Sequence, residues 1–176
     1  GVMYYHGHGV DKDRSQAAVW YQKSGELGDS EGWRLLALLF EAGDGVDRSL
    51  EKALFLYKKA ASMGSVVASR NAGVVLDNAR QYAEAMKYYQ VAALRGDCQA
   101  QRLIGLLFDN GQGVEQDFAK AMQWYRLAAA QNEARAMCLI GILYDNGQGV
   151  EQDRHEAARW YKRSIDAGNK DCYKEL

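Results

Sequence analysis

The sequence predicts an all-α solenoid, in which antiparallel helix pairs stack on copies of themselves. The nine residues DNGQGVEQD occur at 109–117 and again at 145–153, which sets a period of 36 residues. A fixed period of about 20 to 50 residues is typical of repeat proteins. Proline is absent, as suits a chain of helices and glycine turns. Five repeats are visible as pairs of large residues, at Trp20-Tyr21, Leu56-Tyr57, Tyr88-Tyr89, Trp124-Tyr125 and Trp160-Tyr161.

The repeat pattern extends over the whole chain, so we expect residues 1–176 to form a single repeat domain. One repeat is shortened around Ala79 and Arg80, because Gly73 to Ala85 spans 12 residues where equivalent positions elsewhere span 16. Neither end carries the polar cap that usually closes an array, so we expect a fragment of a longer solenoid. The expected repeats are 1–29 (partial), 30–65, 66–97 (shortened), 98–133, 134–169 and 170–176 (the start of a further repeat).

Each repeat is expected to hold two helices joined by a glycine turn. In the repeat 98–133, apolar residues at helical spacing predict a first helix over about 99–109. Gly111 and Gly113 end it, because glycine leaves a helix at positive φ without a steric cost. Asp117 is expected to cap the second helix by accepting from its free amides. The same register holds Asp13, Ser49 and Asp153.

The two helices of a repeat are predicted to cross closely, because small residues recur at one position of each. Gly105 and Ala121 mark this crossing in the repeat 98–133. Trp124 and Trp160 are expected to add large apolar areas to the same core.

Residues 100–131, AQRLIGLLFDNGQGVEQDFAKAMQWYRLAAAQ, resemble the Sel-one-like repeat (SLR), a relative of the tetratricopeptide repeat. The likeness lies in the small-residue helix, the GxGV turn, the D-x-x-K start and the WY-x-x-AA second helix, and it extends over essentially the whole chain. The shortened repeat departs from it and is more similar to a tetratricopeptide turn. The resemblance implies a right-handed α/α superhelix whose concave face binds protein, commonly in bacterial adaptors or scaffolds.

If the first helices line that concave face, three registers outside the core pattern form a candidate partner site. An arginine, an aliphatic residue and an acid follow one another at spacings of 4 and 3, which places them on one stripe of a helix. Such a surface suits an extended or helical peptide whose carboxylates or carbonyls face the arginines. The candidates are Arg34, Arg70 and Arg102, with Cys138 breaking the series; Leu38, Val74, Leu106 and Ile142; Glu41, Asp77, Asp109 and Asp145; and Asn78, Asn110 and Asn146.

A structural interpretation of the same residues stays open. The acids can hydrogen-bond amides of the glycine turns. The arginines can pair with acids of neighbouring repeats, where such pairs contribute about 0 to 1 kcal/mol. The aliphatic row belongs to the core if the helix phase is shifted by one position.

We therefore expect a non-enzymatic module that binds a protein or peptide and uses no cofactor. The net charge of −1 shows no excess of positive charge that would attract nucleic acid. No stretch approaches the roughly 20 apolar residues of a membrane span, so no direct membrane insertion is expected. The alternative is a binder of glycans or cell-wall components, for which Trp33 is the one good aromatic candidate in the groove.

A hydrolase is a distant third possibility. Ser49 and Lys52 match the SxxK pattern of serine β-lactamases, an activity linked to some cysteine-rich relatives of the family. Ser49 aligns with the cap Asp117, however, and the accompanying SDN and KTG motifs are missing. The GxG pairs follow helices rather than strands, which weakens them as phosphate sites.

The histidines and cysteines predict neither a metal site nor a disulfide framework. His6 and His8 lack a third ligand at suitable spacing. Cys98, Cys138 and Cys172 are odd in number and lie at non-equivalent positions, so at least one is expected to be a free thiol. A free thiol favours a reducing compartment, whereas the resemblance favours export, and localisation stays open.

Overall fold

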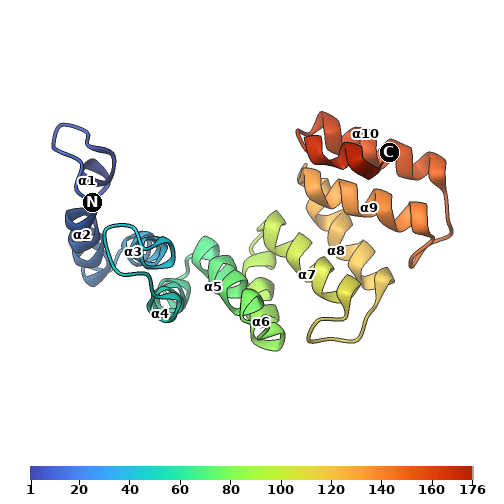
Figure 1. Ribbon diagram of the computed structural model, residues 1–176. Helices are drawn as coiled ribbons and strands as arrows, with labels where there is room; N and C mark the ends of the chain where they lie inside the picture. Colours follow the sequence, from blue (N-terminus) through green and yellow to red (C-terminus); the bar gives the residue numbers. More distant parts are fainter. Residues whose placement is uncertain (176) are drawn as a thin grey trace. The chain divides into compact units, whose positions relative to one another are not determined.

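The computed structural model describes residues 1–175 and the side chains of residues 1–172, and it is entirely helical over this part (Figure 1). Residues 1–175 form ten α-helices and a short 3-10 helix, η1. Their bounds are α1 (Val2–His6), α2 (Arg14–Glu26), α3 (Ser30–Ala42), α4 (Leu50–Ser62), α5 (Val66–Asn78), α6 (Tyr82–Ala93), α7 (Cys98–Asn110), α8 (Phe118–Ala130), α9 (Ala134–Asn146), α10 (Arg154–Asp166) and η1 (Lys170–Glu175).

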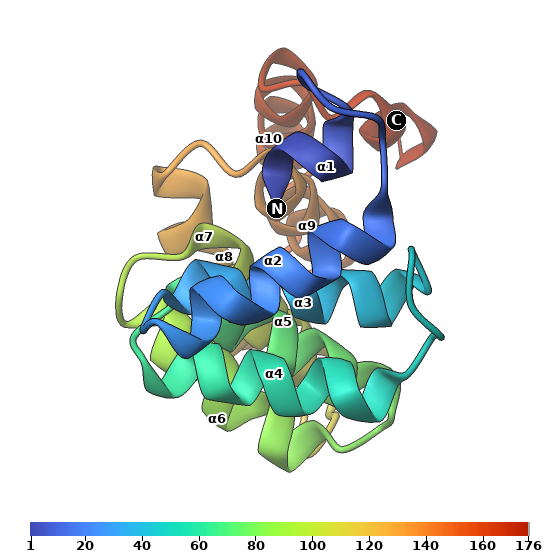
Figure 2. The ribbon, with the colours of Figure 1, turned by 90° about the vertical axis from the view of Figure 1, so that its left-hand side faces the viewer.

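The chain divides into two compact units, residues 1–79 and 80–176. In the first unit, each helix from α1 to α5 packs on its sequence neighbour, and Figure 2 shows α2, α3 and α4 side by side. In the second unit, α6 to α10 pack in the same consecutive manner and η1 contacts both α9 and α10. The predicted all-α solenoid of antiparallel helix pairs is therefore confirmed.

Capping side chains set the helix boundaries within a residue or two of those expected. The carboxylate of Asp117 accepts from the amide of Lys120 at 2.9 Å, and this hydrogen bond leads the causes that hold the pKa of Asp117 below its usual value. Gly111 ends α7 at φ 65°, and Gly113 follows at φ 71°. Asp153 accepts from the amides of His155 and Glu156 at the start of α10. Because each cap satisfies amides that a helix leaves free, the sequence could place these ends.

The shortened repeat differs from the others at its turn. Arg80 occupies the left-handed region at φ 60°, where other repeats place glycine. Gln81, at the start of α6, makes no side-chain capping hydrogen bond. The shortened turn therefore has neither the turn glycines nor the side-chain helix cap seen in the repeat 98–133.

The close helix crossing is confirmed, and tyrosine is the large residue that fills it. Tyr125 is fully buried, and a Cβ added at Gly105 would lie 2.4 Å from its Cε1 atom. Gly141 stands in the same relation to Tyr161, at 2.5 Å. A side chain at either glycine would require the tyrosine ring to shift. The repeat 30–65 has Ala37 at the equivalent position, opposite the buried Tyr57.

The tryptophans contribute less to the core than predicted, although Trp160 packs against a core cluster of the second unit. Trp124 and Trp160 are half-buried, and Trp20 is 45% exposed, because the neighbouring tyrosine takes the inward position. Trp33, expected in an open groove, is only 5% exposed. It lies against Gly25, where a Cβ would come within 2.4 Å of its ring, and Lys59 Nζ covers it at 3.6 Å from the centroid.

Candidate functional site

Two of the predicted acids, each near the end of the first helix of its repeat, accept a hydrogen bond from a tyrosine hydroxyl. The Tyr125 hydroxyl donates to Asp109 Oδ2 at 2.8 Å, and the Tyr57 hydroxyl donates to Glu41 Oε2 at 2.6 Å. Burial raises the pKa of Asp109, and burial followed by the nearby Asp109 charge raises the pKa of Tyr125. For Glu41 and Asp109, the structure therefore pairs the carboxylate with a tyrosine of the second helix.

The expectation that the acids hold the glycine turns is replaced by another contact. The side chain of Gln116 donates to the Asp109 carbonyl at 2.6 Å, and Gln152 donates to the Asp145 carbonyl at 2.5 Å. Arg48 plays the same part for the Glu41 carbonyl, at 3.0 Å. The second glutamine of DNGQGVEQD thus satisfies a carbonyl that the helix end would leave free.

The arginine row is largely engaged within the chain. Arg34 Nε donates to Glu31 at 2.7 Å, one helical turn earlier. Arg102 Nε lies 3.3 Å from the carboxylate of Glu133, which also caps α9 through the amide of Ala136 at 2.6 Å. Arg70 is half-buried. The Arg102 pair links α7 to the residue that caps the start of α9.

The aliphatic row has the predicted phase. Its members are neither fully buried nor fully exposed, and Leu106 and Ile142 also pack against core clusters. The row consists of Leu38, Val74, Leu106 and Ile142.

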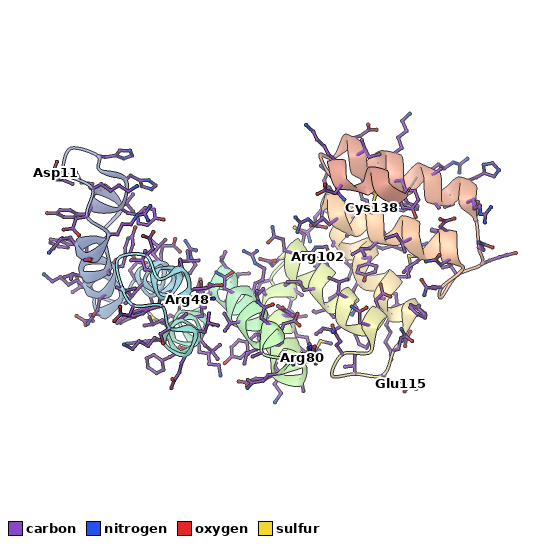
Figure 3. The ribbon with its side chains drawn as sticks, viewed as in Figure 1. Asp11, Arg48, Arg80, Arg102, Glu115 and Cys138 are labelled. Atoms are coloured by element: carbon purple, nitrogen blue, oxygen red, sulfur yellow. A yellow bond between two sulfur atoms is a disulfide. The ribbon has the colours of Figure 1, made fainter. Side chains whose placement is uncertain are left out.

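In the second unit, two of these rows meet in one pocket. A shallow, open pocket of about 310 Å³ gathers Arg102 and Leu106 of α7 with Cys138 and Ile142 of α9, all four in the registers proposed from the sequence. Figure 3 labels Arg102 and Cys138, which lie on these two helices. We call this cavity the α7/α9 pocket. Its remaining lining residues are Arg135, Leu139, Asn169, Asp171 and Cys172.

The other predicted site residues lie outside this pocket. Asp109, Asp145, Asn110 and Asn146 do not line it. In the first unit, Leu38 lines a separate and mostly apolar cavity of about 320 Å³ with Tyr5, His6 and Tyr21. The other candidates of the first unit do not line that cavity; they are Arg34, Glu41, Arg70, Val74, Asp77 and Asn78.

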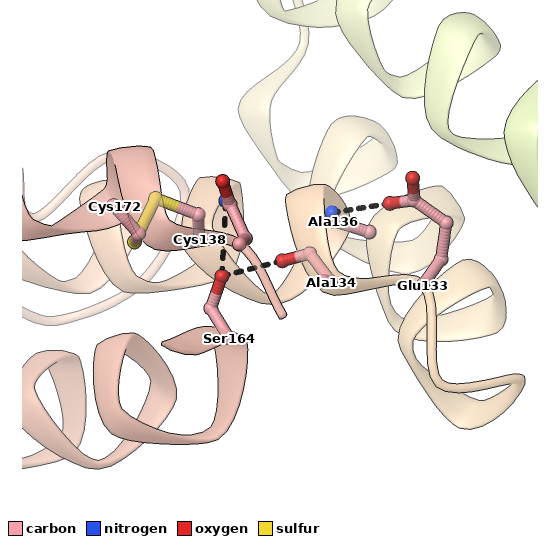
Figure 4. The surroundings of a disulfide bond; sticks show 7 residues. Glu133, Ala134, Ala136, Cys138, Ser164 and Cys172 are labelled. Atoms are coloured by element: carbon pink, nitrogen blue, oxygen red, sulfur yellow. Dashed lines mark hydrogen bonds between the residues drawn. A yellow bond between two sulfur atoms is a disulfide. The ribbon is translucent and has the colours of Figure 1, made fainter. Parts of the chain in front are cut away.

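The expectation of no disulfide framework is wrong for two of the three cysteines. Cys138 and Cys172 form a disulfide across 34 residues, and it lines the α7/α9 pocket (Figure 4). Cys98 is the free thiol. The odd count had correctly required one free thiol, but it could not tell which two cysteines pair.

The helix pairs and their residues match a known repeat. The model of the Sel1 repeat matches residues 1–29, 34–65, 79–97, 98–133 and 134–169, which together make up most of the chain. The chain belongs to the Sel1 repeat family. These matches confirm the Sel-one-like resemblance seen in the sequence. The shortened repeat is matched only from residue 79 onward.

Solved structures of Sel1 repeat proteins have the same fold. A Sel1 repeat protein from Oxalobacter formigenes is 33% identical, with a TM-score of 0.88 over 99% of this chain and 73% of that one. The protective antigen c5321 of uropathogenic Escherichia coli, which displays an SLR fold, is 26% identical with a TM-score of 0.89. This chain is 97% covered in that comparison and spans 38% of the antigen.

Helicobacter pylori cysteine-rich protein B shares the fold at 24% identity and a TM-score of 0.58, with 76% of this chain and 99% of that one covered. A search of curated proteins found no match. Sel1 repeats are typical protein-interaction scaffolds, and helical repeats of this kind offer extended surfaces for partners.

The SxxK pattern has a structural role in this Sel1 array. The Ser49 hydroxyl accepts from the amide of Lys52 at 3.2 Å as a helix cap. The Lys52 ammonium lies 5.2 Å from the ring centroid of Phe40, and Lys120 lies 5.5 Å from that of Phe108. The lysine therefore recurs next to an aromatic ring in both repeats.

The part of the chain that the structure describes holds neither a candidate metal site nor a candidate membrane span. His6 and His8 stack with their ring centroids 5.3 Å apart, and no group of three metal-ligating side chains occurs among these residues. Within the same residues, no helix has the length and apolar character that a membrane span requires.

Proposed function

We propose that this Sel1 array is a non-enzymatic adaptor that binds a protein or peptide, with the α7/α9 pocket as the anchoring site. The observation that carries the proposal is that Arg102, Leu106 and Ile142, selected from the repeat pattern, line one cavity. Their recurrence is not explained by the core alone, because all three remain partly accessible. The glycan alternative loses its main support, since Trp33 is buried.

The lining fits an aliphatic side chain next to a carboxylate. Leu106, Leu139 and Ile142 offer apolar surface, whose burial stabilises a complex by about 25 cal/mol per Å². Arg135 is exposed and makes no ion pair among the described residues. Its planar guanidinium can hold a carboxylate through two parallel hydrogen bonds.

Arg102 has a supporting part in this site. Its side chain is 13% exposed and that of Glu133 is 11% exposed, so their ion pair is largely shielded from water. A ligand carboxylate near Arg102 must therefore share the guanidinium with Glu133. We assign the first contact with the ligand to Arg135 and the second to Arg102.

The polar ends of the first helices extend the proposed surface. Asn110 and Asn146 are exposed, and an amide side chain can both donate to and accept from a peptide backbone. Asp109 and Asp145 complete this edge in the second unit. A corresponding surface is proposed for the first unit, made of Arg34, Leu38, Glu41, Arg70, Val74, Asp77 and Asn78.

A displayed library of short peptides, selected on the oxidised protein, tests the proposal. We expect enrichment of sequences that place an acidic residue beside an aliphatic one. Fluorescence anisotropy with a selected peptide then compares Arg135→Glu with Lys162→Glu, a matched charge reversal on an exposed residue of α10 outside the pocket. Arg135→Glu should weaken binding about tenfold or more, as for charge pairs at interfaces, and equal effects of both variants would contradict the proposal.

A further inference from the structure

The C-terminal turn forms one wall of the α7/α9 pocket. Asn169, Asp171 and Cys172 line the pocket from the end of α10 and from η1, opposite residues of α7 and α9. Cys172 is 2% exposed and Cys138 is 9% exposed, so their disulfide is packed into the wall. The shape of the pocket therefore depends on where this turn is held.

The first part of the wall is held by hydrogen bonds. The Asn169 side chain donates to the Ser164 hydroxyl at 3.1 Å, and that hydroxyl donates to the Ala134 carbonyl at 2.6 Å (Figure 4). The Asn169 amide also donates to the Ser164 carbonyl at 3.0 Å. Asn169 is thus held to Ser164 of α10, whose hydroxyl in turn bonds to α9, without help from the disulfide.

The next residues are attached differently. The Cys172 amide donates to the Asn169 carbonyl at 3.3 Å, a contact within the turn itself. The disulfide from Cys172 to Cys138 links this part of the turn covalently to α9, and Cys172 also lies in a buried cluster with Ala157 and Tyr161 of α10. Breaking the bond would remove the covalent tether of Cys172 and leave the hydrogen bonds of Asn169 intact.

We propose that the Cys138–Cys172 disulfide is a redox control of the α7/α9 pocket, which holds its ligand in the oxidised form and loses affinity on reduction. This inference rests on the proposed function of the pocket. Cys138 is the more exposed of the two cysteines and lines the pocket, so we assign the attack of a reductant to the Cys138 sulfur.

The reductant is a small dithiol or a protein with a dithiol site. One thiolate attacks the Cys138 sulfur, which forms a mixed disulfide and releases the Cys172 thiolate. The second thiol of the reductant, as its thiolate, displaces the Cys138 thiolate. Two electrons pass to the protein, both cysteine sulfurs take up protons, and the reductant leaves with an intramolecular disulfide.

Under this proposal, peptide binding and reduction of the disulfide are thermodynamically linked. A peptide in the pocket covers the Cys138 sulfur and should slow its reduction. Because the two equilibria are linked, a peptide that prefers the oxidised form by some factor shifts the reduction equilibrium by the same factor. Both quantities can be measured on one preparation.

The test uses the whole chain with Cys98→Ser, so that the pocket holds the only reducible pair of cysteines. The probe is a fluorescein-labelled synthetic peptide of alternating leucine and glutamate. Anisotropy titrations compare oxidised protein with protein reduced by dithiothreitol, and alkylation with mass spectrometry confirms the thiol count. We expect binding to weaken about fivefold or more on reduction, within the usual range of coupling between sites.

Two variants separate the tether from the charge next to it. Cys172→Ser should bind as weakly as the reduced protein and should not respond to the reductant. Asp171→Asn keeps the disulfide and removes a charge at the rim, so its response to reduction should remain. A redox response that disappears in Asp171→Asn would overturn the role of the tether.

The outcomes distinguish the two proposals. Equal peptide affinity in both redox forms, together with sensitivity to Arg135→Glu, would overturn the redox control and leave the binding site standing. No binding by the oxidised protein would overturn the binding site and the redox control that rests on it. Hydrogen exchange checks the mechanism: protection should fall only around 170–172, and a loss that spreads through α9 and α10 would contradict a local change.

Discussion

The ring of Tyr125 fills the space that a side chain on Gly105 would need, with a Cβ there placed 2.4 Å from Cε1. The Tyr125 hydroxyl donates to Asp109, which lies near the end of α7, the helix that also holds Gly105. One tyrosine therefore connects the small-residue position and the acidic position of the first helix. This relationship gives two recurrent features of the repeat a structural cause.

Gly105→Ala should lower the free energy of unfolding by about 1 to 3 kcal/mol, because one added methyl group already overlaps the Tyr125 ring. Helix propensity alone predicts the opposite, a gain of up to about 1 kcal/mol. Urea denaturation decides between the two, with Ala119→Leu on the exposed face of α8 as a control that should change little. A stabilised Gly105→Ala variant would refute the close crossing.

Tyr125→Phe should lower the free energy of unfolding by about 1 to 2 kcal/mol, since it leaves the half-buried Asp109 carboxylate without its donor. Asp109→Asn keeps an acceptor for the hydroxyl and removes a charge that burial disfavours. We expect this second variant to be as stable as the parent at neutral pH or slightly more so. Chemical denaturation of both variants measures the difference, and a severe loss in Asp109→Asn alone would show that the charge itself is needed.

The raised pKa of Asp109 also predicts a pH dependence. The folded state takes up the proton at a higher pH than the unfolded state, whose pKa is near the ordinary 3.8. The contribution of Asp109 to stability therefore improves as pH falls through the folded pKa toward that value. The advantage of Asp109→Asn over the parent should shrink over the same range. Unfolding curves at several pH values test this, and an advantage that grows on acidification would contradict the assignment.

The capping aspartates should show the opposite pH dependence of stability. The backbone amides at the starts of α8 and α10 lower the pKa values of Asp117 and Asp153. Their stabilising contribution is present above the ordinary value of 3.8 and is lost as pH falls through the lowered pKa. Asp117→Asn, compared with the parent by the same unfolding curves, should lose its disadvantage only under strongly acidic conditions. A disadvantage unchanged at low pH would indicate that the carboxylate charge is not involved.

Trp33→Ala should cost about 3 to 5 kcal/mol, because the side chain is almost fully buried against Gly25. Trp20→Ala removes a ring that is 45% exposed and should cost clearly less. Thermal and urea unfolding provide the comparison. Similar losses in both variants would mean that the outer surface of α2 is covered in solution.

Much of the fold could be predicted from the sequence because the helix boundaries of the repeat depend on residues close together in the chain. Glycine at positive φ, capping side chains and helical spacing act over a few residues, so the expected 99–109 helix falls within the observed α7. The small-residue crossing could be predicted as well, since only close packing explains its recurrence. The side chain that fills the crossing could not, because Trp124 and Tyr125 are neighbours in sequence and a small change of helix phase exchanges them.

The candidate site was accessible to sequence reasoning only in part. Leu106 and Ile142 follow the period, and the structure brings them together. Arg135 and Asn169 do not repeat, so no periodic signal could select them. Cys172 pairs with Cys138 through a turn after the last full repeat, and three cysteines leave the choice of pair open.

The central claim is that a partner anchors in the α7/α9 pocket, and a methyl NMR titration tests it most directly. With leucine and isoleucine methyl groups labelled, a selected peptide is added to the oxidised protein. The account predicts that the largest shift changes fall on Leu106, Leu139 and Ile142, which line the pocket. Changes centred instead on Leu127, an exposed residue of α8 outside the pocket, with the three pocket methyls unmoved, would contradict it.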